Sequence, residues 1–243
     1  MSVLLLQLAG PLQSWGSSSR FARRTTEPAP TKSGVIGLLA AALGRDRTAD
    51  LSDLSALRFG VRVDQRGTQV RDFQTAHHID TDEAFPVSER FYLADAVFVA
   101  AVEGPHDQLS ALEQALRRPT FLPYLGRRSC PPSRPLDLGL REDGDLLAAL
   151  RAEPWRASQW HQWRRRRERH VDLEVLIEPT SQEVATRQGR VDTLRDQPLS
   201  FDPAHRRYAL RSVHSLHVTV PNPHAESTGS LGAHDPTIVL RSD

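Results

Sequence analysis

The sequence predicts an α+β protein whose order of elements is close to a ferredoxin-like split βαβ unit with extra strand material. Three observations support this: an apolar run near the amino end, two segments with helical periodicity, and several segments that alternate apolar and polar residues. In chain order they give strand, helix, strand, strand, strand, helix. The 243 residues suffice for one domain or two small ones.

The first strand and helix are the clearest of these elements. The apolar run at residues 3–8 is typical of a buried strand. A helix is predicted over Thr31–Leu43, because Thr31 can cap its first turn and Gly44 can end its last. Its apolar face is broad, so we expect it to pack on the core.

Two alternating segments follow, at residues 58–63 and 68–73, and are predicted to be half-buried strands. Gln65–Gly67 between them fits a hairpin turn. The polar, acidic stretch His77–Ser88 has no period and predicts a projecting loop or a flexible hairpin tip.

Strands return at residues 91–93 and 96–102, and a second helix is predicted at about 107–117. The stretch 121–132 is dense in Pro, Gly and Arg, which predicts a structured loop. A short helix fits 145–151, and residues 155–170 have moderate helical potential.

The carboxyl-terminal part contains two convincing strand patterns, at 171–177 and 216–220, with an exposed loop predicted at 181–195. The organisation we expect is therefore a first region over 1–140, a β-containing region over 141–220, and a mostly mobile tail over 221–243.

Composition excludes several classes of protein. One cysteine, Cys130, excludes an internal disulfide and a thiolate-rich zinc site, and the histidines lack ligand spacing. The chain has neither a signal-peptide pattern nor a membrane-length apolar stretch, so a cytoplasmic protein is expected. Lys32 is the only lysine among 31 basic residues. That bias suits phosphate binding by arginine, but a GC-rich genome explains it equally.

Several motifs allow a nucleic-acid interpretation and a purely structural one. The helix start Thr31–Gly34 could hold an anion or simply cap a helix, and it lacks the glycines of a nucleotide-binding loop. The loop with Trp15 and Arg20 could stack bases, or Trp15 could pack on the core. The run Arg164–Arg167 could be a binding patch or a solvated face.

Adjacent histidines, His77 and His78, raise a catalytic alternative. Metal-independent ribonucleases use His, Lys or Tyr as acid and base, so either histidine with Tyr92 or Tyr124 could cleave RNA. No partner at loop or helical spacing completes such a pair, and adjacent residues on an extended segment face opposite ways. A third possibility is a protein-only scaffold whose arginines meet acidic subunits.

Five motifs in order resemble one known family. They are LAGPLQSWG at 8–16, PTKSGVIGLLAAALG at 30–44, RDFQT at 71–75, YLADA at 92–96 and PYLGRRSCP at 123–131. These segments are similar to the CasD family of the type I-E CRISPR surveillance complex, Cascade. The resemblance covers residues 1–140 well and the last third only loosely.

The resemblance implies a modified ferredoxin-like, RRM-like (RAMP) domain with a projecting thumb hairpin at about 74–90 and a small C-terminal β region. It implies a non-catalytic, cofactor-free subunit that binds the 5′ handle of CRISPR RNA and caps the backbone filament. Its expected partners are CRISPR RNA, the Cascade backbone subunits and the large PAM-reading subunit, with target DNA contacted indirectly.

The RNA contacts expected on this basis lie in four segments. They are Gln13, Trp15, Gly16, Arg20 and Arg24 in the first loop; Thr31, Lys32, Ser33 and Gly34 at the helix start; Arg71, Gln74 and His77 toward the thumb; and Tyr124, Gly126, Arg127, Arg128 and Ser129 in the Pro/Arg-dense turn. Arginine would pair phosphates, backbone N–H groups would hold handle oxygens, and Tyr or His would stack on bases.

Overall fold

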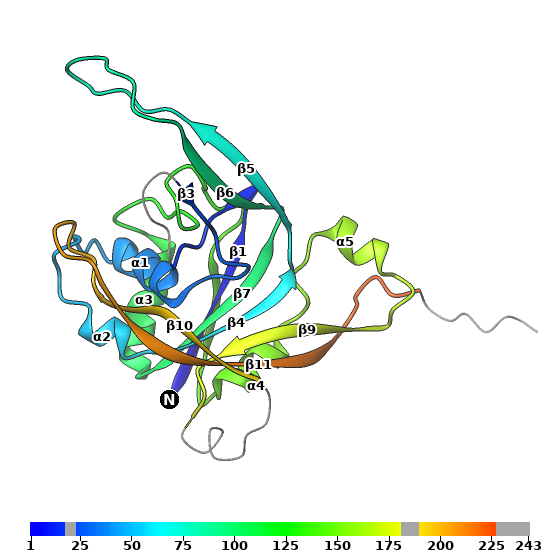
Figure 1. Cartoon of the computed structure of the whole chain (residues 1–243). Coiled ribbons are helices and arrows are strands. Elements are labelled where there is room, and N and C mark those ends of the chain that lie inside the picture. Colours follow the sequence, from blue (N-terminus) through cyan, green and yellow to red (C-terminus); the bar gives the residue numbers. More distant parts are fainter. Residues whose placement is uncertain (18–22, 181–189, 227–243) are drawn as a thin grey trace, which may run out of the picture.

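The computed structural model describes residues 1–17, 23–180 and 190–226, and its centre is one antiparallel sheet of seven strands (Figure 1). In spatial order the strands are β10 (Arg190–Ser200), β11 (Arg207–Pro221), β9 (His170–Ile177), β4 (Arg58–Gln65), β7 (Val97–Gly104), β1 (Ser2–Ala9) and β8 (Asp137–Arg141).

A smaller sheet of four strands lies at one end of the large one. Its strands are β2 (Leu12–Gln13), β3 (Arg23–Arg24), β5 (Thr68–Gln74) and β6 (Ser88–Ala94), and each of the other three pairs with β6. The helices are α1 (Lys32–Ala42), α2 (Ser52–Ser55), α3 (His106–Arg117), α4 (Leu146–Ala152) and α5 (Gln159–Arg164). Within the described residues, no helix combines the length and apolar character that a membrane crossing requires.

The first strand lies in the core on both of its faces. Leu4, Leu6 and Leu8 pack in one apolar cluster with residues of α1 and α3, whereas Val3 and Leu5 pack in a second cluster with residues of α4 and β9. Successive side chains of a strand point to opposite faces. A strand covered on both faces is therefore mostly apolar, which explains why five of the six residues at 3–8 are Val or Leu and why the sixth, Gln7, is also buried.

The two long helices form where their periodicity predicts them. The Thr31 hydroxyl accepts a hydrogen bond from Gly34 N–H at the start of α1, and Gly44 takes a φ of 77° just beyond its end. In α3 the buried residues are Leu109, Leu112 and Leu116, which share one helical face.

The predicted hairpin between residues 58–63 and 68–73 is wrong. β4 pairs with β7 and β9 in the large sheet, but β5 pairs with β6 in the small one. The chain bends between the sheets at Gly67, whose φ is 70° and whose hydrogen atom faces the Ala94 carbonyl at a distance too short for a side chain. A glycine turn signal fits such a bend as well as a hairpin.

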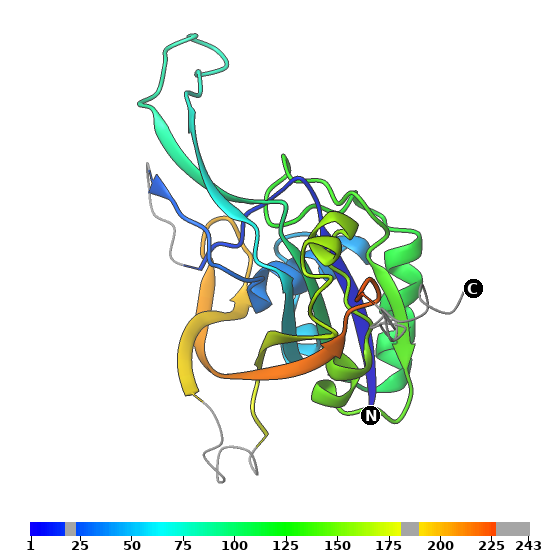
Figure 2. The ribbon, with the colours of Figure 1, turned by 90° about the vertical axis from the view of Figure 1, so that its right-hand side faces the viewer.

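β5 and β6 instead form a hairpin that projects from the body of the molecule (Figures 1 and 2). Residues 75–87, which join the two strands, are all exposed. A bridge between His77 and Ala84 continues the pairing beyond the strands. The structure thus agrees with the prediction of a projecting polar segment here.

The exposed loop predicted at 181–195 is partly corrected. Residues 190–195 belong to β10, which pairs along its length with β11, while 181–189 lie outside the described residues. β9 pairs with β4, so the strands of the carboxyl-terminal region extend the same sheet. Of the predicted tail, β11 ends at Pro221 and residues 222–226 follow it; residues 227–243 are not described.

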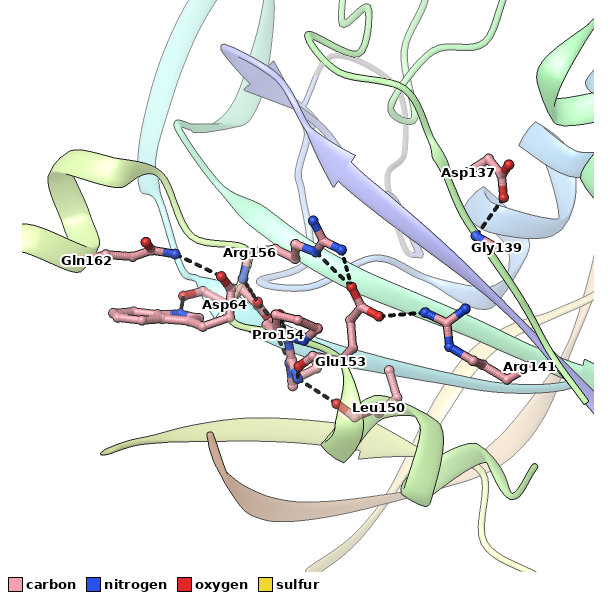
Figure 3. Close-up of polar contacts among 11 residues, drawn as sticks. Asp64, Asp137, Gly139, Arg141, Leu150, Glu153, Pro154, Arg156 and Gln162 are labelled. Carbon is pink, nitrogen blue, oxygen red and sulfur yellow. Dashed lines mark hydrogen bonds and ion pairs between the residues drawn. The ribbon is translucent and has the colours of Figure 1, made fainter. Parts of the chain in front are cut away.

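The segment between α4 and α5 is attached to β4 through buried polar groups (Figure 3). Arg62 and Asp64 are fully buried and form an ion pair at 2.7 Å. Arg62 also donates to three carbonyls at and just after the end of α4, those of Leu150, Glu153 and Pro154. A helix leaves its last carbonyls without partners. The guanidinium supplies donors there and thereby fixes the connection to α5.

Candidate nucleic-acid interface

Three of the four segments expected to contact RNA meet at the base of the projecting hairpin. Ser14 N–H donates to the Leu125 carbonyl at 3.1 Å, which joins the first loop to the Pro/Arg-dense turn. β3 pairs with β6 and places Arg23 and Arg24 beside the hairpin. We call the surface formed by Arg23, Arg24, Arg71, Arg127 and Arg128 with Phe73 and Phe91 the hairpin-base surface.

Gly126 determines how closely the turn approaches the first loop. Its φ is 83°, and a Cβ atom there would lie 1.8 Å from the Ser14 carbonyl oxygen. No side chain fits, so the turn can pack against the loop only with glycine at this position. This contact fixes the backbone that carries Arg127 and Arg128.

Arg127 links three parts of this surface. Its guanidinium lies 4.7 Å from the centroid of the Tyr92 ring, and its Nη2 donates to the Arg24 carbonyl at 2.9 Å. Its Nη1 is buried and has no acceptor among the described residues. No carboxylate in that part of the chain pairs with Arg127 or Arg128, so neither charge is neutralised, and exposed Arg128 is the more accessible of the two to an anion.

The opposite face of the hairpin base combines arginine with phenylalanine. The Arg71 guanidinium lies 4.8 Å from the Phe73 ring, and that of Arg23 lies 5.3 Å from the Phe91 ring. Arg71 and Phe91 are directly opposite in the β5–β6 register, so they share a face. Glu89 is 3.9 Å from Arg23, which is a weak pair at an exposed site. Cations and aromatic rings alternate here as phosphates and bases do in a single strand.

The start of α1 binds an anion, but the anion belongs to the protein itself. Asp196 of β10 is fully buried and accepts a 2.8 Å hydrogen bond from Lys32 N–H, the first amide of the helix. Arg211 pairs with the same carboxylate. A carboxylate at a helix amino terminus satisfies amides that lack partners and interacts favourably with the helix dipole. The site that the sequence offers to phosphate is therefore occupied by Asp196.

The side chains at this helix start are also withdrawn from solvent. Thr31, Lys32 and Ser33 are 2%, 3% and 9% exposed, and the Lys32 ammonium pairs with Glu178 at 2.9 Å. Burial lowers the pKa of Lys32, and the neighbouring Glu178 carboxylate opposes that shift. Contrary to the expectation, these three side chains form an internal charged cluster and do not reach the hairpin-base surface.

Trp15 packs on the core, which is the structural one of the two interpretations of its loop. Its ring is fully buried and packs so closely on α1 that a Cβ at Gly34 would lie 2.7 Å from it. Trp15 Nε1 donates to Gln13 Oε1, and the Gln13 amide donates to the carbonyls of Leu8 and Ala96. Both side chains are buried in the core and hydrogen-bonded there, so neither can stack on or hydrogen-bond to RNA in this conformation.

The remaining predicted contacts are spread more widely. Gln74 is half-buried and donates to Asp72, whereas His77 is exposed on the outer hairpin with its Nδ1 3.3 Å from the Asp82 carboxylate. Gly16 and Ser129 are exposed and Tyr124 is half-buried near the turn. Arg20 lies outside the described residues.

The hairpin separates His77 from Tyr92, one of the pairs considered for acid–base cleavage of RNA. Tyr92 is opposite Val70 in register and 3% exposed, while His77 lies seven residues farther along the hairpin. At about 3.3 Å per residue that separation is roughly 20 Å, too far for both groups to act on one phosphodiester. Among the described residues, no three metal-ligating side chains are grouped together.

Several residues at the site were not selected from the sequence. Phe73 lies beside Arg71, and Phe91 lies beside Arg23. The spacing of Arg71 and Phe73 could have identified Phe73, because residues two apart on a strand share a face, whereas Phe91 is brought there by strand pairing. Asp196 gave no such signal, since it lies 164 positions from the amide it binds.

Comparisons with known proteins agree on one family. A family model described as "CRISPR-associated protein (Cas_Cas5)" matches residues 3–214. The CRISPR system Cascade subunit CasD of Escherichia coli (strain K12) is 40% identical over 169 residues, which are 61% of this chain and 75% of that protein. A solved structure titled "CRISPR RNA-guided surveillance complex" is 35% identical, covers 94% of this chain and 95% of its own, and has a TM-score of 0.73.

A second solved structure, titled "Crystal structure of Cas protein", is 38% identical and covers 93% of this chain and 98% of its own, with a TM-score of 0.64. The family model spans most of the sequence, from β1 into β11. The chain therefore belongs to the Cas5 family of CRISPR-associated proteins.

Proposed function

We propose that the protein is a non-catalytic subunit of a CRISPR RNA-guided surveillance complex of the Cascade type, and that it binds the 5′ handle of CRISPR RNA on the hairpin-base surface. The family and the names of its relatives support a place in such a complex. The observation that carries the RNA-binding part is a group of arginines that have no acidic partner in the described part of the chain, Arg24, Arg71, Arg127 and Arg128, beside Phe73 and Phe91.

The chemistry of this surface suits a single RNA strand. Arginine can donate two hydrogen bonds to one phosphate, and unstacked bases pack on aromatic rings or on guanidinium planes. Arg71 and Arg127 lie on opposite faces of the small sheet. A handle that contacts both would therefore bend around the hairpin base, with Arg128 exposed along its path.

We further propose that residues 1–141 form a ferredoxin-like, RRM-like core. Two features support this assignment: the chain order β1, α1, β4, β7, α3, β8 and the spatial order β8–β1–β7–β4, in which β7 separates β1 from β4. A strand inserted between the two strands of a βαβ unit is the mark of the split βαβ arrangement.

The projecting hairpin is proposed as the thumb that contacts the neighbouring backbone subunit, so that this chain caps the filament. The support is the exposure of Ile79, Phe85 and Val87 at its outer end, where 95%, 51% and 55% of each residue is accessible. Exposed apolar groups on a protruding element are typical of a surface covered in an assembly. The large PAM-reading subunit would dock nearby, and target DNA would be met indirectly.

Handle binding is tested by replacing Arg127 and Arg128 with alanine and measuring affinity for handle RNA against salt. Each lost contact to a phosphate of a single strand lowers the slope of log K against log salt by roughly 0.7, so we expect a slope smaller by about 1.4 and weaker binding at every salt concentration. R128A alone serves as the milder variant, because Arg128 is exposed and has no ion-pair partner among the described residues.

The matched control is R47A/R118A, which removes the same charge from exposed positions, one in the loop after α1 and one at the end of α3. Unchanged affinity and slope in R127A/R128A would contradict the assignment of the surface. The same RNA should be recovered intact after incubation in EDTA. Site-specific cleavage that is lost in H77A would overturn the non-catalytic part of the proposal.

A further inference from the structure

A second surface with exposed aromatic and basic side chains lies on α5. Trp160 and Trp163 are 55% and 58% exposed, although tryptophan is normally well covered in a folded protein. They are three residues apart on the helix and so lie on the same side of it. Trp160 is in edge-to-face contact with His161, and Trp163 with His224.

Basic side chains without acidic partners accompany these rings. Arg165 pairs with Glu168 and Arg166 with Glu226, but Arg164 and Arg167 are exposed and have no partner among the described residues. Burial lowers the pKa of the neighbouring His161, and the positive charges of Arg165 and Arg164 lower it further. The arginine run is therefore only partly neutralised.

An open pocket of about 390 Å³ adjoins α5, and polar groups line it. Arg134, Arg156, Gln159 and His224 are among its lining residues. Arg156 is paired with Glu153, whereas Arg134 is exposed and has no partner among the described residues. Pockets that hold an anchor residue at a protein–protein interface are well desolvated, and interface cores are depleted of charge. A pocket lined by hydrogen-bond donors and cations suits phosphate oxygens better.

The position of this surface is fixed before any ligand binds. Trp155 Nε1 donates to the Asp64 carbonyl, and Asp64 Oδ2 accepts from Arg156 N–H. The Gln162 amide donates to the carbonyls of Trp155 and Ala157, which holds α5 against the chain that precedes it (Figure 3). Because the platform is already rigid, little conformational entropy of the protein is lost when a strand binds.

The α5 surface lies at the same end of the large sheet as the hairpin base (Figure 2). Ser158 donates to the Gln65 side chain at the end of β4, and the Gln65 amide donates to the Asp95 carbonyl beside β6. Ser133, which precedes Arg134, is hydrogen-bonded to the Ala9 carbonyl at the end of β1. Arg134 therefore lies between the Pro/Arg-dense turn and the α5 pocket.

We propose that α5 and its pocket are a second binding site for single-stranded nucleic acid. Trp160 and Trp163 stack on successive bases, while Arg134, Arg164 and Arg167 bind the phosphates between and beside them. Stacking on aromatic rings next to a basic groove is the usual means of binding a single strand without reading its sequence. The inference does not depend on handle recognition, because it involves different residues and requires no particular sequence.

The test uses the intrinsic fluorescence of the full-length chain. Of its four tryptophans, Trp15 and Trp155 are buried, so quenching on titration with a 20-nucleotide oligouridine reports mainly on Trp160 and Trp163. We expect quenching in the wild type and its loss in W160A/W163A, with affinity lowered about tenfold or more, since each stacked base contributes appreciably. R164A/R167A should retain the quenching at saturation but lower the salt slope by roughly 1.4.

Two comparisons make the outcome decisive. Oligothymidine in place of oligouridine distinguishes a site for any single strand from one that requires the 2′-hydroxyl. R47A/R118A is the charge-matched control, and thermal unfolding checks that each variant is folded.

If neither oligonucleotide quenches the wild type and W160A/W163A binds both as well as the wild type does, the proposal is wrong. Normal oligonucleotide binding by W160A/W163A together with impaired assembly would identify a protein-docking surface instead. If oligonucleotides quench the wild type as expected but R127A/R128A binds handle RNA normally, the α5 site is supported and only the proposed handle site is refuted.

Discussion

At the scale of single residues, two buried contacts decide what the predicted binding segments can do. Asp196 occupies the amino terminus of α1, and Lys32 turns inward to Glu178, so a segment that resembles a phosphate site serves to fasten α1 to β9 and β10. Gly126 instead helps to build the hairpin-base surface, because its lack of a side chain lets the turn that carries Arg127 approach the first loop. The start of α1, which resembles an anion site, thus serves folding, whereas the turn at Gly126 supports the hairpin-base surface.

Gly126→Ala tests the close approach at the hairpin base. The alanine would be strained by its φ of 83° and would overlap the Ser14 carbonyl, so we expect a loss of more than about 2 kcal/mol in the free energy of unfolding and weaker binding of handle RNA. Gly139→Ala is the matched control. Its φ is 94°, but the nearest atom to its Cβ is the mobile end of Arg141 at 3.2 Å.

The control isolates backbone strain from overlap. Gly139→Ala should cost only about 1 kcal/mol and leave RNA affinity unchanged. Urea unfolding and RNA titration measure both quantities. Equal losses of stability in the two variants would show that overlap with Ser14 is unimportant.

Lys32→Met tests the charge buried at α1. Burial lowers the pKa of Lys32 in the folded protein below its ordinary value of 10.5. Between the lowered and the ordinary pKa the unfolded chain holds the extra proton, so the free energy of unfolding of the wild type should rise with pH in that window. At pH values below the folded pKa, Lys32 contributes no pH dependence.

The comparison is unusually clean because Lys32 is the only lysine. The difference in pH dependence between wild type and K32M therefore reports on Lys32. Urea unfolding at intervals up to pH 10.5 measures it. Parallel stability curves for the two proteins would show that the pKa of Lys32 is not lowered.

At the scale of elements, the small sheet carries the hairpin and holds it away from the core. β5 and β6 pair over their full length, whereas the hydrogen bonds of residues 75–87 remain within the hairpin. β2 and β3 pair with the inner half and the outer end of β6, which attaches the first loop to the hairpin. The element thus has a fixed base and an exposed, independent end.

Replacing residues 75–87 with an Asn-Gly turn tests that independence. Because these side chains are all exposed, the free energy of unfolding should change by less than about 0.5 kcal/mol. Handle affinity of the isolated chain should also be kept, since the hairpin-base surface is intact. Incorporation into the assembled complex should fall, because the exposed Ile79 and Phe85 are removed.

Chemical denaturation, RNA titration and co-purification with the other subunits measure the three quantities. The uncut hairpin carrying D80N, a substitution at its exposed tip, is the control for a change that removes no apolar group. Normal assembly of the shortened protein would exclude the hairpin as the contact with the neighbouring subunit.

At the scale of the whole molecule, one sheet joins the amino-terminal and carboxyl-terminal parts of the chain. β9 pairs with β4, and β11 and β10 extend the sheet beyond it. β10 then supplies Asp196 to α1, and the α4–α5 connection is fixed on β4 by Arg62. Both candidate RNA-binding surfaces lie at the end of this sheet where the small sheet begins (Figures 1 and 2).

The sequence alone determined the local elements and the family. The run at 3–8, the cap and stop of α1, and the leucines of α3 each depend on neighbours within a few residues, so periodicity and end signals sufficed. Five ordered motifs sufficed for the family. Tertiary structure alone decided that Gly67 marks a bend between two sheets, that Trp15 belongs to the core, and that Asp196 binds the start of α1. These outcomes depend on partners far apart in the chain, and the free energy of burying a group is set by those partners and not by its local sequence.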